Sequence, residues 1–242
     1  MKEFFGSTQG IEFVEFGLVH LTLLFLIILG TFLIYKFRKQ IREYKYEKQV
    51  RYTLASFAIA WEVALYIWIS VNIGWDWGSN LLILSLCGLA LILAIISMFT
   101  KNYKIFEIGY FWSIGGLVSV LFPDITYSID RFRFYQFMFG HMLFFYMFMY
   151  LLFVHNFIPT FKSFKKSTSI LFIYCMIMLI PNAIWNTNGL FLRESEGTPF
   201  EIFEGGPYIL YLTGVILLAA VVMYLWFLLV HLYEVKVYNK NN

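Results

Sequence analysis

The chain has 242 residues, of which 60% are hydrophobic and 14% are charged, and its net charge is only +3. A soluble domain has roughly half apolar and a quarter charged residues, and a chain of this length cannot bury so much apolar surface in a core. Composition therefore excludes a soluble globular domain, a disordered chain, a nucleic-acid-binding protein and a disulfide-linked secreted scaffold. It predicts an all-α, polytopic membrane protein.

Seven apolar stretches approach the length of about 20 residues that a membrane-spanning helix needs. The fourth is the shortest and contains Gly115 and Gly116. The stretches cover residues 14–35, 53–73, 81–99, 106–122, 134–154, 167–187 and 207–233. Because the connections are short, neighbouring spans should run antiparallel. We therefore expect one domain over residues 1–242, a bundle of seven transmembrane helices.

The basic residues predict how this bundle is oriented. Fourteen of the 18 lysines and arginines fall in the segments 36–52, 100–105 and 155–166 and in the tail after Leu232. Positive charge marks the cytoplasmic side of a membrane protein, so we expect the N-terminus outside and the C-terminus in the cytoplasm. The first apolar stretch is full length and is followed by basic residues instead of a small-residue cleavage site, so we expect no cleavable signal peptide.

Cysteine and histidine usage argues against a disulfide framework and a metal site. Cys87 and Cys175 both lie inside apolar runs, and no spacing typical of a metal site occurs. We therefore expect neither a metal nor another cofactor. One alternative is a b-type haem between His20 and His141.

Several polar residues fall inside the apolar stretches, where they are costly and are functional candidates. Counted from the outer ends of four spans, one set lies at a common depth of roughly 9–11 Å, at about 1.5 Å per residue. This set is His20, Cys87, His141 and Asn182. Glu62 lies deeper in the second span, Gln136 lies above His141, and Arg133 lies at the outer rim.

The common depth suggests nucleophilic chemistry on a lipid. A thiol needs a nearby base to become a thiolate, and imidazole is the usual base. Cys87 and His141 could form this catalytic pair at the level of the ester carbonyls of a phospholipid. The side chains of Asn182, Gln136 and His20 could then stabilise the oxyanion of acyl transfer, and Arg133 could bind a lipid phosphate.

Each of these residues also has a purely structural interpretation. The thiol can act as a small hydrophobic group, and the histidines can bond to carbonyls across helices. Arg133 can be an interfacial arginine. As a second function, Glu62, His20 and Asn182 could line the pathway of a non-enzymatic transporter or lipid carrier. A third hypothesis is a scaffold or sensor subunit without a pathway.

Four short motifs resemble one known family. They are the residues LCGLAL at 86–91, EIGYFW at 107–112, FPD at 122–124 and RFYQFMFGH at 133–141. Together they resemble the YwaF-type integral membrane proteins of bacteria, over most of the chain. This family is related to the eukaryotic transmembrane acyltransferases that place arachidonoyl chains on ether phospholipids.

The resemblance implies an activity, a partner and a location. It implies that Cys87 takes an acyl chain from one lipid and passes it to a lyso acceptor, while His141 moves the proton. Membrane phospholipids are the implied partners, and the bacterial plasma membrane is the implied location. Bacterial members tend to have an acidic residue directly after this cysteine, where this chain has Gly88.

Overall fold

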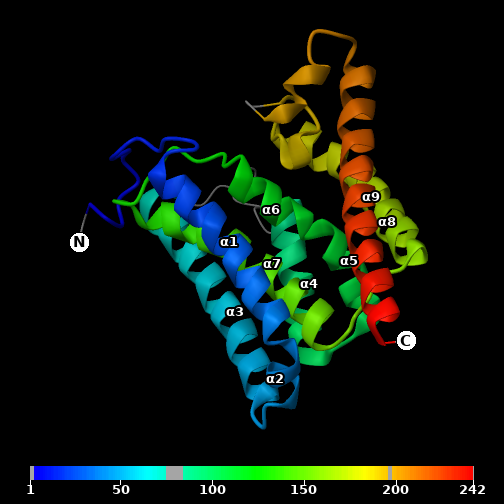
Figure 1. The fold of residues 1–242 in the computed structure, drawn as a ribbon. Helices are drawn as coiled ribbons and strands as arrows, with labels where there is room; N and C mark the ends of the chain where they lie inside the picture. Colours follow the sequence, from blue (N-terminus) through cyan, green and yellow to red (C-terminus); the bar gives the residue numbers. More distant parts are fainter. Residues whose placement is uncertain (1–2, 75–83, 196–197, 242) are drawn as a thin grey trace.

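The computed structural model describes residues 3–74, 84–195 and 198–241, with the backbone alone from residue 234 onward. Within these residues the regular structure is entirely helical, which confirms the expected fold class for the described part of the chain (Figure 1). The helices are α1 (Leu18–Lys36), α2 (Arg38–Glu43), α3 (Glu47–Asn72), α4 (Leu86–Thr100), α5 (Tyr103–Trp112), α6 (Ile114–Leu121), α7 (Phe132–Val154), α8 (Phe161–Trp185) and α9 (Tyr208–Asn241), with short 3-10 turns η2 (Gly189–Phe191) and η3 (Pro199–Phe203).

Six helical segments in the described residues are long and apolar enough to cross a membrane. They are α1, α3, the joined α5 and α6, α7, α8 and the first 26 residues of α9. The predicted third span is shorter than expected: α4 has 15 residues, or about 22 Å of helix. Residues 81–83 of that predicted span lie outside the described part. A seventh crossing by α4 therefore stays a prediction, as does the orientation.

The fourth predicted span is broken into α5 and α6 at Ser113, whose hydroxyl donates to the carbonyl of Tyr110 (2.7 Å). Just beyond the break, α6 lies very close to α7. A Cβ at Gly116 would lie 2.6 Å from the Phe144 ring and 3.0 Å from the carbonyl oxygen of His141. Glycine at this position therefore permits an approach that a larger residue would block.

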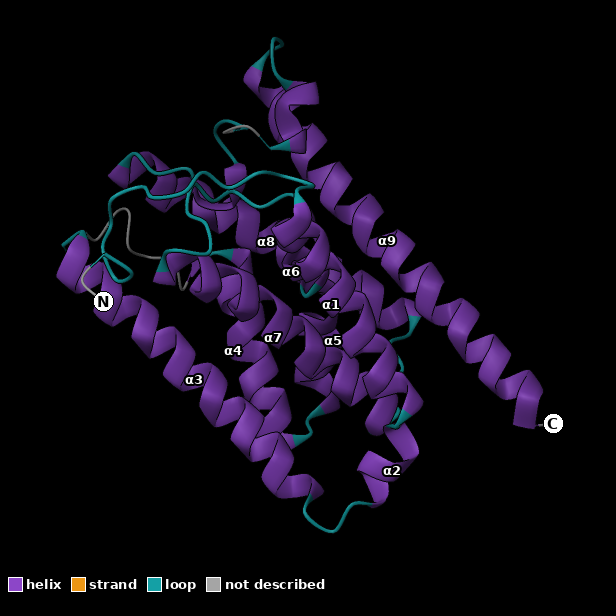
Figure 2. Ribbon diagram, turned by 60° about the vertical axis from the view of Figure 1, so that its left-hand side comes forward, coloured by secondary structure: helices purple, strands orange, loops and turns teal. Residues whose placement is uncertain are grey.

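Helix α7 is central, and α1 and α9 are peripheral. In the most apolar 18-residue stretch of each helix, 61% of the residues are buried in α7, but only 17% are buried in α1 and 17% in α9. Figures 1 and 2 show α3 on one side of α7 and α9 on the other. The peripheral helices expose large apolar side chains, such as Ile28 and Leu217, which is the pattern of helices that face lipid.

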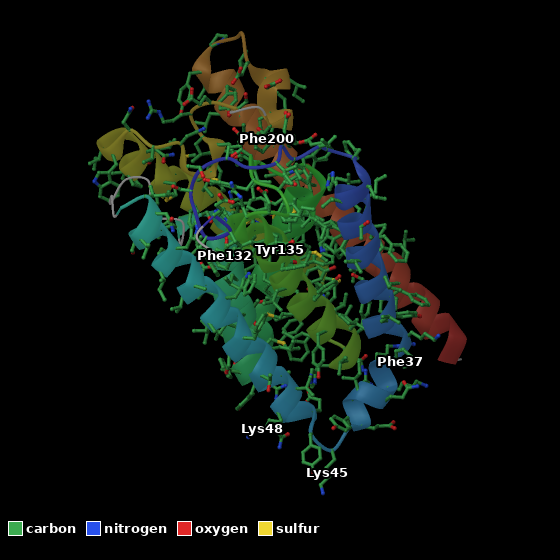
Figure 3. All side chains as sticks on the ribbon, turned by 90° about the vertical axis from the view of Figure 1, so that its left-hand side faces the viewer. Phe37, Lys45, Lys48, Phe132, Tyr135 and Phe200 are labelled. Atoms are coloured by element: carbon green, nitrogen blue, oxygen red, sulfur yellow. The ribbon has the colours of Figure 1, made fainter. Side chains whose placement is uncertain are left out.

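The two ends of the bundle differ in charge. Lys45 and Lys48 lie at one end, and Phe200 lies towards the opposite end (Figure 3). At the charged end, Arg42 of α2 donates to the carbonyl oxygens of Val154 and Phe153. These carbonyls belong to the last turn of α7 and receive no hydrogen bond from a backbone N–H of that helix. Arg42 supplies the missing donors, so α2 caps the end of α7.

Candidate functional site

A large cavity lies between the pair α8 and α9 and the wall that α3, α4, α6 and α7 form. Its volume is about 1320 Å³, beyond the roughly 300–1,000 Å³ of most small-molecule pockets. The lining is mainly apolar, with a few polar side chains of interest: Glu62, Cys87, Ser119, Arg133, Gln136 and His141. A cavity of this size and character suits a large apolar ligand.

One face of α7 supplies the longest polar stripe of the cavity wall. The lining residues of this helix are Arg133, Gln136, Phe137, Gly140, His141 and Phe144. Their separations alternate between three residues and one, which is the repeat of a single helical face. The helix therefore aims Arg133, Gln136 and His141 into the same space.

Cys87 lies at the N-terminus of α4, as the second residue of the helix. Ser85 caps this end by accepting a hydrogen bond from the N–H of Gly88 (3.0 Å). The first N–H groups of a helix have no acceptor within it and give this end partial positive charge. The Cys87 sulfur lies 3.8 Å from the hydroxyl oxygen of Ser119.

One ring nitrogen of His141 has no hydrogen-bond partner among the described residues. Its Nδ1 lies 2.7 Å from the carbonyl oxygen of Phe137. Because a carbonyl only accepts, Nδ1 carries the hydrogen, and in the neutral ring Nε2 has the lone pair. Phe137 and Phe144 pack against the ring, with centroids 4.3 and 5.6 Å away. His141 and Cys87 line the same cavity, although the hydrogen-bond partner of the thiol is Ser119 and not His141.

Charged side chains line the cavity from several elements: Glu62 from α3, Asp124 from the connection after α6, Arg133 from α7 and Lys165 from α8. Arg133 donates to the side-chain oxygen of Gln136, and its guanidinium lies 5.7 Å from the centre of the Phe137 ring. Glu62 reaches the cavity from α3. Within the described residues neither Glu62 nor Arg133 forms an ion pair with another side chain. Among the described residues, the cavity lining thus holds two cationic and two anionic side chains.

His20 lies outside the cavity lining, and its two ring nitrogens are both in use. The N–H of Phe16 donates to Nδ1 (2.9 Å), and Nε2 lies 2.7 Å from the carbonyl oxygen of Val120. Val120 belongs to the last turn of α6, whose carbonyls lack helical partners. His20 therefore ties α1 to the end of α6, and its nitrogens have no lone pair left for a substrate.

Asn182 also lies outside the cavity lining and holds the connection after α8. Its side-chain oxygen accepts from the N–H of Gly189 (2.8 Å) and the hydroxyl of Thr187 (3.0 Å), and its nitrogen donates to the carbonyl of Gly189 (2.9 Å). A Cβ at Gly189 would lie 2.9 Å from the Asn182 oxygen. This contact holds Leu190–Leu192 and Phe200 where they form part of the cavity wall.

Two serines of the site were not among the residues predicted from sequence. Ser85 caps α4, and its signal in the sequence was a serine, a residue type preferred at helix N-caps, between apolar residues. Ser119 follows Gly115 by four residues and thus shares its helical face. A Cβ at Gly115 would lie 3.7 Å from the Cys87 sulfur, so both positions face the thiol.

Comparisons with known proteins identify the family. Neither the curated proteins nor the solved structures include a match to the chain. The profile of the TMEM164 family matches residues 15–227. This range covers all seven predicted spans, except for the first residue of the first span and the last six residues of the seventh. The chain is therefore a multi-pass membrane protein that belongs to the TMEM164 family.

Proposed function

We propose that the chain is an intramembrane phospholipid acyltransferase or acyl hydrolase that works through an acyl-enzyme on Cys87. The observation that carries this proposal is the shared cavity: a thiol at a helix N-terminus and an imidazole with a free Nε2 line one large apolar space. A nucleophile, a base and room for a lipid are the parts that acyl transfer needs.

The reaction proceeds in two balanced steps. The sulfur of Cys87 attacks the carbonyl carbon of a lipid ester while His141 Nε2 takes the thiol proton. The bond between the acyl carbon and the ester oxygen breaks, and the released lyso-lipid alkoxide receives that proton. A lyso-lipid hydroxyl or a water molecule then attacks the thioester carbon and gives its proton to Nε2. The bond between the acyl carbon and sulfur breaks, the acyl group leaves as a new ester or a fatty acid, and the sulfur takes the proton back from Nε2.

Groups near Cys87 stabilise the charge that develops in both steps. The backbone N–H groups in the first turn of α4 point towards this end of the helix, where an oxyanion would form. Gln136 adds an amide and Arg133 a cation for the lipid phosphate. His20 and Asn182 do not take part, because their polar atoms bind backbone and loop groups.

The transporter or lipid carrier has less support. Its pathway would need Glu62, His20 and Asn182 to share one water-accessible route, but only Glu62 lines the large cavity. In the enzyme, Glu62 of α3 instead provides a carboxylate to the cavity that Cys87 and Gly88 also line.

Mass spectrometry of the purified protein after incubation with a phospholipid of defined acyl chains tests this proposal. We expect a thioester adduct on Cys87 that hydroxylamine removes. Cys87→Ala should abolish the adduct and acyl exchange, whereas the matched control Cys175→Ala should retain both, since Cys175 lines the same cavity without Ser119 beside it. Acyl exchange that survives in Cys87→Ala would refute the acyl-enzyme.

A further inference from the structure

The large cavity extends towards both ends of the bundle, and its wall has a cation in each half. Arg133 is the second residue of α7, far from the charged end, where α7 stops. Lys165 lines the cavity as the fifth residue of α8. Its neighbour Lys166 forms an ion pair with Glu107 (2.5 Å), which lies in the second turn of α5, close to the charged end. One continuous space therefore connects two levels of the bundle.

Polar side chains continue from Arg133 towards the middle of the wall. His141 follows Arg133 by eight residues on the same helix and the same cavity, or by about 12 Å. Ser119 of α6 and Cys87 at the start of α4 line this part too, with the hydroxyl oxygen and the sulfur 3.8 Å apart. All four side chains are partly exposed, so a polar group inside the cavity can reach them.

Helix α8 continues the series towards the charged end. Lys165 and Ser169 both line the cavity and are exposed, and their separation of four residues places them on one helical face. Tyr174 shows their level, because its hydroxyl donates to the carbonyl of Leu84 (2.5 Å), just before α4 begins. Ser169 precedes Tyr174 by five residues, or about 8 Å. Its hydroxyl therefore lies between the start of α4 and Lys165.

The cavity is also open at the side of the bundle. Ile173 of α8 and Leu217 of α9 belong to its lining and are 57% and 59% exposed, and Val118 of α6 is 38% exposed. Lining side chains with such exposure lie at the rim of a cavity. Around the apolar helices of a membrane protein the surroundings are acyl chains, so a phospholipid can place its headgroup inside while its chains stay in the membrane.

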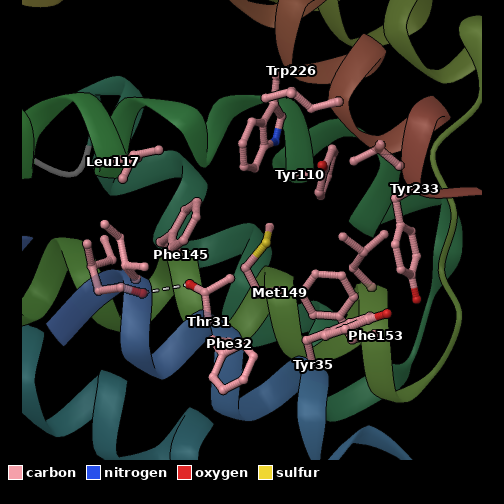
Figure 4. A pocket seen from close by; sticks show the side chains of 15 residues that line it. Thr31, Phe32, Tyr35, Tyr110, Leu117, Phe145, Met149, Phe153, Trp226 and Tyr233 are labelled. Atoms are coloured by element: carbon pink, nitrogen blue, oxygen red, sulfur yellow. Dashed lines mark hydrogen bonds between the residues drawn. The ribbon is translucent and has the colours of Figure 1, made fainter. Parts of the chain in front are cut away.

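A smaller groove between α1, α5, α7 and α9 has no such series of polar groups (Figure 4). Among the described residues its lining has no lysine, arginine, aspartate or glutamate. The hydroxyl of Thr31 donates to the carbonyl of Ile27 (2.7 Å) within the same helix. A charged headgroup would stay unpaired there, which is costly in an apolar site. Of these two spaces, the large cavity is the one that suits a headgroup.

The barrier to lipid movement between leaflets arises from the polar headgroup. A charged group in hydrocarbon is costly unless it is paired or hydrogen-bonded, and polar side chains at membrane depth mark the pathways of polar substrates. Arg133 and Lys165 can each bind a phosphate group, and His141 and Ser169 offer hydrogen bonds between them. The series therefore lowers the cost of a headgroup at successive depths.

We propose that this cavity also moves phospholipids between the two leaflets. The headgroup passes along the series from Arg133 to Lys165 while the acyl chains remain in the membrane. The movement is passive and runs in both directions, because no bond forms or breaks. This route uses neither His20 nor Asn182, and it does not require acyl transfer on Cys87.

The test uses the purified full chain in vesicles of phosphatidylcholine and phosphatidylglycerol. A trace of phosphatidylethanolamine carries a nitrobenzoxadiazole label on its headgroup, where acyl transfer does not remove it. Dithionite bleaches the label in the outer leaflet only, so the inner-leaflet label resists in protein-free vesicles. We expect the protein to make nearly all of the label accessible, in a second phase of bleaching.

Two variants test the route along α8. Ser169→Leu should slow the second phase roughly fivefold, as the loss of one hydrogen bond predicts. Lys165→Leu should slow it roughly tenfold or more, because a charged donor binds phosphate more strongly. Lys162→Leu is the matched control, since this lysine is exposed on the same helix one turn earlier and does not line the cavity.

Several results would overturn the proposal. Wild-type vesicles that retain as much label as protein-free vesicles do so without any variant having to fold. Equal rates for Lys165→Leu and Lys162→Leu would place the route outside the cavity, and bleaching of a water-soluble dye trapped in the same vesicles would replace lipid movement with leakage. Cys87→Ala should keep the second phase while it loses the acyl adduct, so each function can fail without the other. Loss of both in Cys87→Ala would mean that the label crosses only as a product of acyl transfer.

Discussion

His20 and His141 show how one residue type takes two roles at a similar depth in the bundle. Both nitrogens of His20 bind the backbone of other segments, and one of these partners, Val120, lies 100 residues away. Within the described residues, His141 hydrogen-bonds to the carbonyl one turn before it, and Nε2 has no partner. The difference therefore arises from the neighbours of each ring.

Replacing each histidine should separate these roles. His141→Gln should slow acyl-adduct formation on Cys87 by about 10² to 10⁴-fold, the usual contribution of a general base, with little change in stability. His20→Ala leaves Val120 and Phe16 without partners and should destabilise the protein by about 1–3 kcal/mol. Single-turnover mass spectrometry and thermal unfolding in detergent measure the two effects. Equal loss of adduct rate in both variants would contradict the assignment.

Part of this site can be predicted from sequence alone. Depth along the fifth span selects Arg133, Gln136 and His141 as candidates, and the structure places these side chains in one cavity. The roles of His20 and Asn182 could not be predicted, because their partners come from other helices and from a loop. Depth along a helix follows from counting residues, whereas the direction of a side chain depends on tertiary packing.

At the scale of elements, the connection between α8 and α9 is held by a few polar contacts. Asn182 binds Gly189 through both its side-chain oxygen and its nitrogen. The backbone has positive φ at Asn186, Leu190 and Phe191, which non-glycine residues adopt only where their surroundings require it. The cavity wall at this end thus depends on Asn182.

Asn182→Leu should release this connection. The leucine cannot bind Gly189, so the amide of Gly189 should lose protection from hydrogen exchange, while the core of α7 stays protected. Hydrogen-exchange mass spectrometry in detergent measures both regions. Thr187→Val, which removes only the contact of 3.0 Å with the Asn182 oxygen, is the milder control. Unchanged protection of Gly189 in Asn182→Leu would show that other contacts hold the loop.

The same connection should respond to acid through Glu204. Hydrogen bonds from Ser195 hold the pKa of Glu204 below its usual 4.5, and the N–H of Ser195 lies 2.9 Å from a Glu204 carboxylate oxygen. Because the pKa is lower in the folded loop, this contact contributes stability above pH 4.5 that is lost as pH falls through the folded value.

An NMR titration of the Ser195 amide follows this contact directly. Its proton shift should move with a midpoint below 4.5, and Glu204→Gln should remove the titration. A midpoint at or above the usual value would mean that the carboxylate and Ser195 do not interact in solution.

The contact between α6 and α7 lies beside Cys87 and His141. A Cβ at Gly116 would collide with Phe144, whereas a Cβ at Gly115 would make an ordinary 3.7 Å contact with the Cys87 sulfur. Gly116→Val should therefore destabilise the protein by about 1–3 kcal/mol, and Gly115→Ala much less. Thermal unfolding of both variants in detergent measures the difference. Equal stability would place the helices farther apart than the structure does.

At the scale of the whole molecule, the positions and lengths of the apolar stretches in the sequence predicted most of the helices. Helices α1, α3, α7, α8 and α9 lie on predicted stretches, because hydrophobicity and length dominate folding in a bilayer. The exceptions have local causes. Helix α4 begins at Leu86 because Ser85 caps it there, and the fourth stretch breaks at Ser113, where the hydroxyl donates to the backbone one turn earlier.

A carboxylate joins several helices at the charged end of the bundle. An oxygen of Glu47 accepts from Arg51 (3.0 Å) and from the hydroxyl of Tyr150 (2.9 Å), and it lies 2.7 Å from Nε2 of His155. Arg51 also donates to the carbonyl of Met98. The α3, α4 and α7 helices thus meet at this group.

Glu47→Gln should therefore destabilise the whole bundle. Arg51 is only 3% exposed, and without the carboxylate its charge would be buried and unpaired, which costs about 3 kcal/mol or more. Lys166→Ala is the control: it removes an ion pair with Glu107 in which the lysine is 40% exposed, and such a pair contributes about 1 kcal/mol or less. Thermal unfolding in detergent should show a much larger loss for Glu47→Gln. Similar losses for both variants would mean that water reaches Arg51, and that α3, α4 and α7 are held together by apolar packing alone.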